Sequence, residues 1–596
     1  MAKKCKDKKV SIGGQAVLEG VMMRGKTAMA TAVRDSDGII RLETKRLKSK
    51  KSFFTKLPIV RGVVSFVQSL FGGTAVLMRS ADVYAEGEPS KFEKWLAEKL
   101  KINVMSVVGT ISLILGLALA VFLFMWLPQT LRVLLEKIFA IEFDVWARNF
   151  IEGGLKLLVF VSYILLTSLL KDIRRTFMYH GAEHKTITCY EKGLPLTVEN
   201  AKKCRRVHDR CGTTFIVLVM LVSILLFALF EGILVTNEIY LHKALRVLCK
   251  VAFLPLIAGV SYELLKALSK TDFFIFYPLK LPGLLLQKIT TREPDDKMLE
   301  VAITAFNKVL QMDNDQTIEE VTFVVPRKRE ELLKEIKNTL ASSGIEEEAE
   351  AEWIVSLSLG IKRDEVYSDK LVSCKNVEKI NNIVKERITG RPLWYCIGDT
   401  EFYGYKIKVD ERCLIPRPET ELLAEQVIKI AKSDSKILDL CTGSGAIAVA
   451  VKKETNAIVT ASDISDKAIE IAKENASLNG AEIRFVLSDM FTFLEGEKFD
   501  IIVSNPPYIK KEEIDILQVE VKDFEPILAL DGGDDGLDFY KIIATEAKKH
   551  LNQGGVLLLE CGYNQAEEIK DLLGEFKSIE IIKDYENIDR IVKAVL

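Results

Sequence analysis

The chain has 596 residues, of which 48% are hydrophobic and 28% are charged, and its formal net charge is −1. Its length excludes a single hydrophobic core, so several domains are expected. The ten cysteines are scattered and form no paired framework, which favours reduced thiols in a cytosolic setting over a disulfide-stapled secreted fold.

The first half of the chain combines basic segments with long apolar runs. Residues 1–9 are basic but lead into a Gly-rich, mixed stretch, so no cleavable signal peptide is predicted. Four apolar segments are long enough to cross a bilayer: 104–127, 154–170, 214–235 and 245–265. Lys250 and Pro255 in the last segment leave a three-span arrangement open. Buried helices of a soluble protein are the alternative interpretation.

Two further features bear on the membrane arrangement. The segment 59–78 is apolar but broken by glycines, which favours an interfacial or re-entrant placement. Residues 171–212 carry ten Lys and Arg residues, whereas 128–153 carries three. Because basic loops are retained in the cytoplasm, residues 1–103, 171–212 and everything after 266 are predicted to be cytoplasmic. We therefore expect a multi-pass protein of the cell membrane.

Residues 180–184 read His-Gly-Ala-Glu-His, which fits a His-x-x-Glu-His pattern. Two histidines one helical turn apart can hold zinc while the glutamate polarises its water. The candidate ligands of a divalent metal are His180, Glu183, His184 and His208, with Glu19, Cys211 and Glu263 as further candidates. Because Lys and Arg crowd this loop, a structural network of His and Glu hydrogen bonds stays an equal alternative.

Four motifs in this half resemble a bacterial membrane protein family of unknown function, the YqhQ-like family. The motifs lie at 13–25, 179–185, 208–213 and 293–296. The family is sometimes described as predicted metal-dependent enzymes. The resemblance implies an α-helical membrane domain over 1–310 with about four transmembrane helices, acting as a metal-dependent enzyme or as a scaffold that tethers the second half.

The second half reads as a soluble protein. A polar linker is predicted over 311–327, and apolar residues at helical spacing predict a small helical domain over 328–390. Short apolar strands then alternate with helical segments, which predicts a parallel, doubly wound α/β sheet with ligands at the carboxyl ends of its strands. The segments are 436–440, 446–454, 457–462, 466–479, 482–487, 499–504, 537–551 and 554–560.

A Gly-rich turn follows the first of these strands. Its glycines let the backbone turn sharply and approach a ligand closely. Asp463 ends the next strand about 20 residues later, where a carboxylate can accept both ribose hydroxyls; a helix N-cap is the alternative role. Ala448 replaces the third glycine of a dinucleotide fingerprint, which disfavours a dehydrogenase. The candidate cofactor residues are Asp439, Cys441, Thr442, Gly443, Ser444, Gly445, Asp463, Asp489, Met490 and Asn505.

The strand at 499–504 ends in Asn505, Pro506, Pro507 and Tyr508. An amide nitrogen is a poor nucleophile, so a catalyst must position it. The Asn505 side-chain oxygen and the Pro506 carbonyl can each accept one N–H. Pro507 stiffens the turn and Tyr508 can pack on a planar amide. The four residues are the candidate catalytic and substrate-binding set, and the predicted chemistry is methyl transfer to nitrogen.

Residues 328–596 resemble the release factor glutamine N5-methyltransferases, the HemK/PrmC-type family. The matching stretches are 390–398, 402–404, 415–421, 439–445, 505–508, 524–526, 531–536 and 560–562. The resemblance implies a Rossmann-like, S-adenosylmethionine-dependent domain over 391–596 and a helical substrate-recognition domain over 328–390. It also implies methylation of the glutamine of the Gly-Gly-Gln motif in peptide chain release factors. Cys441 stands where the family usually has glycine, and Met490 where an aromatic residue is common.

Methylation of adenine N6 in nucleic acids is the alternative chemistry, because those enzymes share a related Asn/Asp-Pro-Pro-Tyr turn. Such enzymes need a basic target-recognition surface, and the sequence 391–596 contains no such block. No direct DNA binding is therefore expected.

Overall fold

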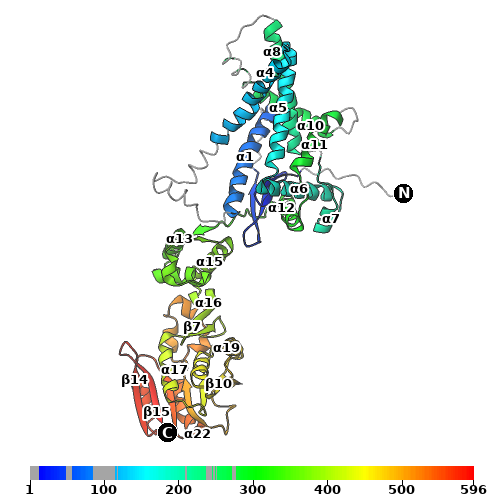
Figure 1. The fold of residues 1–596 in the computed structure, drawn as a ribbon. Helices are drawn as coiled ribbons and strands as arrows, with labels where there is room; N and C mark the ends of the chain where they lie inside the picture. The colour runs from blue at the N-terminus through cyan, green and yellow to red at the C-terminus, as the bar shows by residue number, and fades with distance from the viewer. Residues whose placement is uncertain are drawn as a thin grey trace, which may run out of the picture. The chain divides into compact units, whose positions relative to one another are not determined.

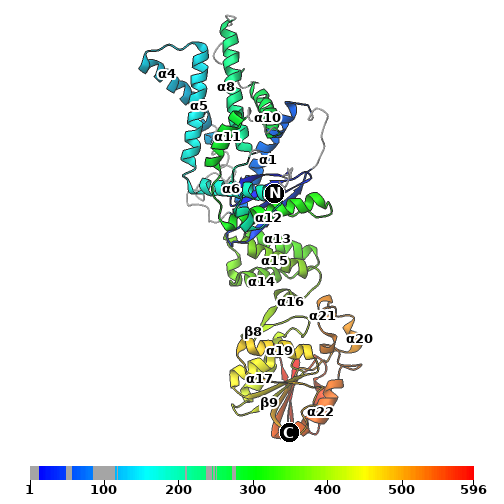
Figure 2. The ribbon, with the colours of Figure 1, turned by 90° about the vertical axis from the view of Figure 1, so that its right-hand side faces the viewer.

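The computed structural model describes residues 12–47, 57–84, 114–116, 118–208, 211–236, 245, 249, 252–270 and 277–596. The chain divides into two compact units (Figures 1 and 2). The N-terminal unit comprises Met1–Lys328 and Lys370–Val377, and the C-terminal unit comprises Arg329–Asp369 and Glu378–Leu596. The predicted basic start, 1–9, and parts of the predicted spans 104–127 and 245–265 lie outside the described residues.

The N-terminal unit contains a four-stranded antiparallel sheet in the order β1-β2-β3-β4. Its strands are Gly13–Val17, Gly20–Arg24, Ala28–Arg34 and Ile40–Arg46. Small and flexible side chains of this sheet, such as Met23 and Ala30, pack with Phe306 of α12 (Asp296–Asn314) and Tyr179 of α6 (Lys171–Glu191). The expectation of a purely helical domain over 1–310 is therefore wrong in this part.

Helices make up the rest of the N-terminal unit. Besides α6 and α12, they are α1 (Val60–Tyr84), η2 (Phe122–Trp126), α4 (Leu127–Phe139), α5 (Val145–Thr167), α7 (Val198–Lys202), α8 (Gly212–Thr236), α10 (Leu254–Lys270) and α11 (Tyr277–Thr290). Among the described residues, four helices are long and apolar enough to cross a membrane: Val60–Tyr84, Ile114–Phe139, Val145–Thr167 and Gly212–Leu234.

Three of these helices overlap the predicted segments 104–127, 154–170 and 214–235. The fourth, α1, overlaps none of the predicted spans. It lies where an interfacial or re-entrant segment was predicted, and it is a continuous helix of 25 residues. The described helix within 245–265 is α10, which has 17 residues. The glycines do not break α1, and Gly73 has a packing role: a Cβ there would lie 2.6 Å from Oε1 of Gln15.

The C-terminal unit begins with a helical part. Its elements are α13 (Arg329–Ser342), α14 (Glu348–Leu359), η4 (Arg363–Val366), α16 (Leu393–Ile397) and, from Glu378 onward, α15 (Cys374–Arg387). Arg387 Nε and Nη2 donate to the Glu350 carboxylate at 2.7 and 2.8 Å, and both side chains are buried. Arg387 Nη2 also lies 3.0 Å from Glu520 Oε2 in α21 (Val519–Lys522). This ion pair joins the helical part to the segment that follows β12 (Phe499–Ser504).

A seven-stranded sheet in the order β11-β10-β9-β12-β13-β15-β14 forms the centre of the C-terminal unit. The strands are β9 (Lys436–Leu440), β10 (Ile458–Asp463), β11 (Arg484–Leu487), β12 (Phe499–Ser504), β13 (Leu551–Glu560), β14 (Ser578–Lys583) and β15 (Asp589–Val595). The first five are parallel, as predicted, while β15 runs antiparallel to both neighbours. The prediction of an entirely parallel sheet therefore fails at this edge.

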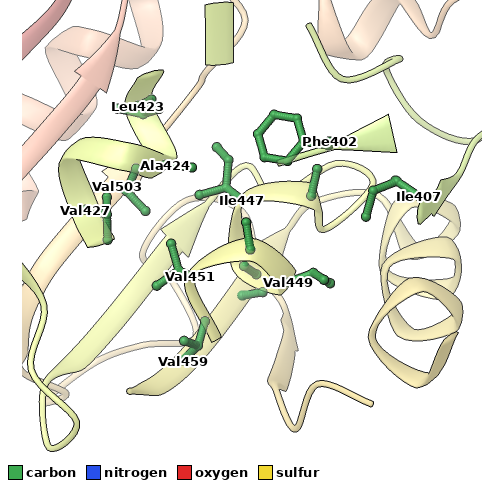
Figure 3. Packing of buried hydrophobic residues seen from close by; sticks show 14 of the residues in the cluster. Phe402, Ile407, Leu423, Ala424, Val427, Ile447, Val449, Val451, Val459 and Val503 are labelled. Carbon is green, nitrogen blue, oxygen red and sulfur yellow. The ribbon is translucent and has the colours of Figure 1, made fainter. Parts of the chain in front are cut away.

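Helices cover this sheet and fix the ends of its strands. They are α17 (Pro418–Ile430), α18 (Ala446–Thr455), α19 (Asp466–Asn479), α20 (Lys511–Ile514), α22 (Asp538–His550) and α23 (Ala566–Leu572). In Figure 3, Ile447 and Val451 of α18 lie in one cluster with residues of α17 and with the strand residues Val459 and Val503. Phe402 of the hairpin β7 (Asp399–Phe402) and β8 (Tyr405–Lys408) closes this cluster. The packing holds the start of α18 at the carboxyl end of β9.

Candidate active site

A pocket opens at the carboxyl ends of β9, β10 and β12. In the sheet, β9 lies between β10 and β12. The connection after β9 leads to β10 on one side of it, and the chain later adds β12 on the opposite side. Such a reversal leaves a crevice at the strand ends that commonly holds a ligand. The predicted residues that line the pocket are Cys441, Thr442, Gly443, Ser444, Asp463, Asp489, Met490, Asn505 and Pro507.

The turn after β9 is held against the end of β10. Gly443 N–H donates to Asp463 Oδ2 and Ser465 N–H donates to Asp463 Oδ1, both at 2.9 Å. Gly443 has a φ of +55°, a conformation that favours glycine. Burial raises the pKa of the Asp463 carboxyl, and these two N–H groups oppose that shift. The carboxylate is therefore fixed in orientation on the pocket wall.

Two predicted cofactor residues shape the turn without lining the pocket. Asp439 is buried, and its Oδ2 accepts a hydrogen bond from Thr442 Oγ1 at 2.5 Å. Burial raises the pKa of Asp439 to about 7. Gly445 has a φ of +78°, and a Cβ there would lie 3.0 Å from the Cβ of Ala472 in α19. Both residues set the path of the backbone into α18.

The two positions that depart from the family pattern are neighbours in space. Cys441 and Met490 have φ values of +61° and +47°, a region that non-glycine residues rarely adopt. The Cys441 sulfur lies 4.0 Å from the Met490 sulfur. A glycine at position 441 would relieve backbone strain, whereas the cysteine fills space against Met490.

Asn505 lines the pocket, and a hydrogen bond to a neighbouring side chain holds its amide group. Asn505 Nδ2 donates to Thr420 Oγ1 at 3.3 Å. The carboxyl of Glu560, at the end of β13, is buried beside Thr420 and Asn505. Since the Nδ2 group is directed to Thr420, Oδ1 is left as an acceptor for a ligand. Burial raises the pKa of Glu560 to about 7.

Pro506 and Tyr508 support this turn from outside the pocket lining. The Tyr508 carbonyl accepts a hydrogen bond from Gln565 Nε2 at 3.0 Å. Burial raises the pKa of the Tyr508 hydroxyl to about 12. Gly532 packs directly on this turn, because a Cβ there would lie 2.7 Å from the Tyr508 Cα.

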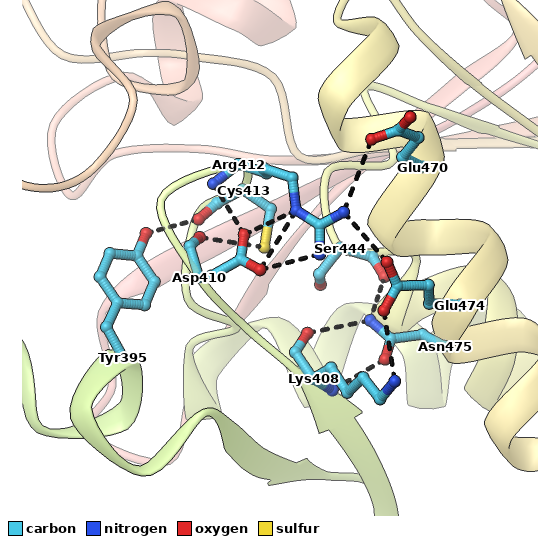
Figure 4. A network of polar contacts seen from close by, with 9 residues as sticks. All are labelled: Tyr395, Lys408, Asp410, Arg412, Cys413, Ser444, Glu470, Glu474 and Asn475. Atoms are coloured by element: carbon cyan, nitrogen blue, oxygen red, sulfur yellow. Dashed lines mark hydrogen bonds and ion pairs between the residues drawn. The ribbon is translucent and has the colours of Figure 1, made fainter. Parts of the chain in front are cut away.

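A polar network that the sequence analysis did not identify holds the opposite wall of the pocket (Figure 4). Arg412 lines the pocket and pairs with Asp410 Oδ2 at 2.8 Å and Glu474 Oε1 at 3.0 Å. Asn475 is buried, and its Nδ2 donates to the Ser444 carbonyl at 2.9 Å. The network joins the loop before α17 to α19 and to the turn after β9. Its members are ordinary charged and amide residues with no motif of their own, so the sequence carried no signal for it.

In the N-terminal unit, a second polar cluster contains three of the candidate metal ligands. Ligand atoms of His180, His184 and Cys211 lie within 4.8 Å of one another. Glu183 is buried next to them, and burial raises its pKa. His208 Nε2 instead lies 3.0 Å from Glu191 Oε2.

The other two candidate ligands are engaged in ion pairs. Glu19 accepts hydrogen bonds from Arg175, with Nη2 at 2.6 Å, and from the Tyr179 hydroxyl at 3.3 Å. Glu263 Oε1 accepts from Arg61 Nε at 2.6 Å. The geometry of the cluster therefore favours Cys211 over His208, Glu19 and Glu263 as the third ligand.

Family models match both halves of the chain. The PrmC N-terminal domain matches 331–398, the methyltransferase small domain matches 418–533, and a protein family of unknown function, DUF1385, matches 57–312. The release factor glutamine methyltransferase of Thermodesulfovibrio yellowstonii is 40% identical over 252 residues, which cover 41% of this chain and 90% of that protein. The corresponding protein of Chlorobaculum tepidum is 40% identical over 44% of this chain and 94% of its own length.

The uncharacterized protein YqhQ of Bacillus subtilis is 36% identical over 307 residues, covering 50% of this chain and 92% of that protein. Among solved structures, a methyltransferase from Pyrococcus furiosus aligns with 32% of this chain and 89% of its own, at 21% identity and a TM-score of 0.26.

Proposed function

Because the chain belongs to the release factor glutamine methyltransferase family in its C-terminal half and to the YqhQ family in its N-terminal half, we propose that it methylates release factors at a membrane. The C-terminal half is an S-adenosylmethionine-dependent methyltransferase. The proposed reaction is transfer of a methyl group to N5 of the glutamine in the Gly-Gly-Gln motif. The observation that carries this proposal is the presence of Asn505 and the Gly443 turn in one pocket.

The pocket residues fit the cofactor. S-adenosylmethionine, when bound, supplies an electrophilic methyl group. Asp463 would accept hydrogen bonds from the two ribose hydroxyls, since two backbone N–H groups already fix its carboxylate. Asp489 and Met490 would flank the adenine, and the turn 441–445 would lie along the remainder of the cofactor. Asp439 and Gly445 would act through the shape of this turn.

The turn at Asn505 fits a glutamine amide. Asn505 Oδ1 and the Pro506 carbonyl would accept the two N–H groups, which aims the nitrogen lone pair at the methyl group. Thr420 holds the Asn505 amide in the required orientation, with the buried Glu560 carboxyl beside it. Pro507 lines the same pocket and Tyr508 supports it. Preorganised acceptors of this kind lower the barrier without a strong general base.

Each part of the chain would have the role that its sequence predicts. We infer that 1–310 is a membrane domain, 311–327 a linker, 328–390 a part that engages the release factor and 391–596 the catalytic domain. The ion pairs of Arg387 with Glu350 and Glu520 support a fixed position of the recognition part relative to the catalytic part.

Exposed apolar side chains on the long helices support the membrane placement. In each of the four candidate helices, between 6% and 28% of the most apolar stretch is buried inside the protein. Phe71, Met78 and Ile138 are exposed by 72%, 64% and 64%. Apolar surface of this extent is stable when lipid or another protein covers it. The basic segment 171–212 supports a cytoplasmic position of the loop that holds it, with the catalytic domain on the same side.

Transfer of labelled methyl groups tests the enzymatic proposal. The purified full chain is incubated with labelled S-adenosylmethionine and either a release factor, the same factor with its motif Gln replaced by Ala, or duplex DNA. We expect label in the intact factor alone. Label in DNA without label in the factor would instead support an adenine methyltransferase. Asn505→Ala should abolish transfer, and Asn479→Ala, whose side chain donates to the Lys406 carbonyl in an exposed position, serves as the matched control.

Cell fractionation tests the membrane proposal. The full chain should sediment with membranes and resist extraction with alkaline carbonate, whereas a fragment covering 329–596 should be soluble and retain methyl transfer. Recovery of the full chain in the soluble fraction would contradict the placement and leave the enzymatic proposal untouched.

A further inference from the structure

Two imidazole nitrogens and one thiol of the N-terminal unit converge on one point. His180 Nε2 lies 3.2 Å from the Cys211 sulfur, and a ring nitrogen of His184 lies within 4.8 Å of both. His180 and His184 come from one face of α6, one turn apart, while Cys211 immediately precedes α8. All three side chains are buried or half-buried. Segments distant in sequence thus bring their ligand atoms within 4.8 Å of one another.

The hydrogen bonds of the two histidines leave both Nε2 atoms as acceptors. His180 Nδ1 lies 2.9 Å from the Thr290 carbonyl, and His184 Nδ1 lies 2.6 Å from the Arg206 carbonyl. A carbonyl can only accept, so each Nδ1 carries the proton and each Nε2 presents a lone pair. One thiol proton cannot satisfy two such lone pairs. Metal-binding histidines typically donate their second N–H to a carbonyl in this way.

The loop that carries Cys211 is held in place by a buried amide. Gln287 of α11 accepts from His208 N–H at 2.9 Å, and its Nε2 donates to the His208 carbonyl and to Thr214 Oγ1 at 3.0 Å each. Thr213 N–H points at the Cys211 sulfur at 3.5 Å, and such a contact stabilises a thiolate. The three ligand positions are therefore built by the fold.

The lysine next to His184 is engaged away from the cluster. Lys185, which follows His184, donates to the Lys202 carbonyl at 2.7 Å and pairs with Glu293. Glu183 places a carboxyl beside the cluster: the side chain is buried, and its Oε2 has no hydrogen-bond partner among the described residues.

We propose that the N-terminal unit binds one Zn²⁺ ion through His180 Nε2, His184 Nε2 and the Cys211 thiolate. Two imidazoles and one thiolate form a donor set that suits zinc and disfavours magnesium or calcium. Three protein ligands leave a fourth position for water, and the unpartnered Glu183 oxygen would accept a hydrogen bond from that water. This site is separate from the methyltransferase pocket, and the proposal goes beyond methyl transfer.

Metal analysis of the full chain, purified in detergent, tests the proposal. We expect about one zinc per chain in the wild type and a loss of zinc affinity above about 100-fold in Cys211→Ser and His184→Ala, exceeding the effect of outer-shell changes. Cys189→Ser is the matched control, since Cys189 is a buried thiol of α6 that donates to the Pro195 carbonyl; it should retain the metal. Equal zinc in Cys211→Ser and wild type would overturn the assignment.

Cobalt substitution gives a readout that does not depend on folded variants. Wild-type chain loaded with Co²⁺ should show a thiolate-to-cobalt charge-transfer band that one equivalent of Zn²⁺ removes. A folded wild-type chain that binds no Zn²⁺ or Co²⁺, or binds Co²⁺ without this band, refutes the site.

Discussion

Replacing Glu560 by Gln should remove a large pH dependence from the stability of the C-terminal unit. Glu560 is 2% exposed at the end of β13, and burial raises its pKa from 4.5 to about 7. Gln keeps the size of the side chain and one acceptor for Thr420, but it cannot ionise. The variant therefore separates the charge of Glu560 from its packing.

The size of the expected change in stability follows from the pKa shift of Glu560. Below pH 4.5 the carboxyl is protonated in both states and contributes no difference. Between pH 4.5 and about 7 the unfolded chain loses this proton while the folded chain keeps it, so stability falls as pH rises. A shift of roughly 2.5 units corresponds to about 3 kcal/mol. The wild type should lose this amount relative to Glu560→Gln between pH 4.5 and 7.5.

Urea unfolding of residues 329–596, followed by circular dichroism at several pH values, measures the difference. Relatives built almost wholly of this part support its use as a fragment. Glu497→Gln is the control: Arg484 lowers the pKa of Glu497, so its contribution to stability is lost only as the pH falls below about 4.5 and should stay nearly constant across the tested range. A wild-type and Glu560→Gln difference that stays constant within about 0.5 kcal/mol across this range would refute a buried, neutral Glu560.

Three further substitutions test the site and its support. Asn505→Ala should lower the rate of methyl transfer by about 100-fold or more, because the amide nitrogen is no longer positioned; a rate within a factor of three would count against its role. Gly445→Ala should destabilise the unit by about 1–2 kcal/mol in urea unfolding, since φ is +78°, and an unchanged midpoint would contradict that backbone strain. Arg387→Met should cost about 3–5 kcal/mol, because Glu350 is left buried and unpaired; the double variant with Glu350→Leu should recover much of this loss, and the absence of recovery would argue against the ion pair as the cause.

The strands and the site turns of the catalytic part could be predicted because their signals are local. β9 and β12 are buried on both faces over most of their length and therefore contain short apolar runs, such as 501–503. The turns that follow them contain Gly443 and Asn505, whose residue types are tied to backbone shape and hydrogen bonding. β14 and β15 gave no such signal, because β14 is a half-exposed edge strand and both strands mix apolar with charged residues.

Other parts depended on contacts between distant segments. The sheet β1 to β4 is rich in Gly, Ala and Met, which have weak strand preference, and it forms because α6 and α12 cover it. Glu560 and Thr420 lie 140 residues apart in sequence, and no spacing rule connects them to Asn505. For the metal ligands, the helical spacing of His180 and His184 was visible, but the choice of Cys211 over His208 required the position of the loop before α8.

The order of the central strands has a consequence for how such a protein could change over evolutionary time. The turns at Gly443 and Asn505 stand 62 residues apart in sequence, yet β9 and β12 are adjacent in the sheet. Mutation, insertion or recombination in the segment after β12 can therefore remodel what is methylated while the cofactor turn after β9 is inherited unchanged. A lineage could exchange one acceptor nitrogen for another without having to rebuild the means of holding the methyl donor.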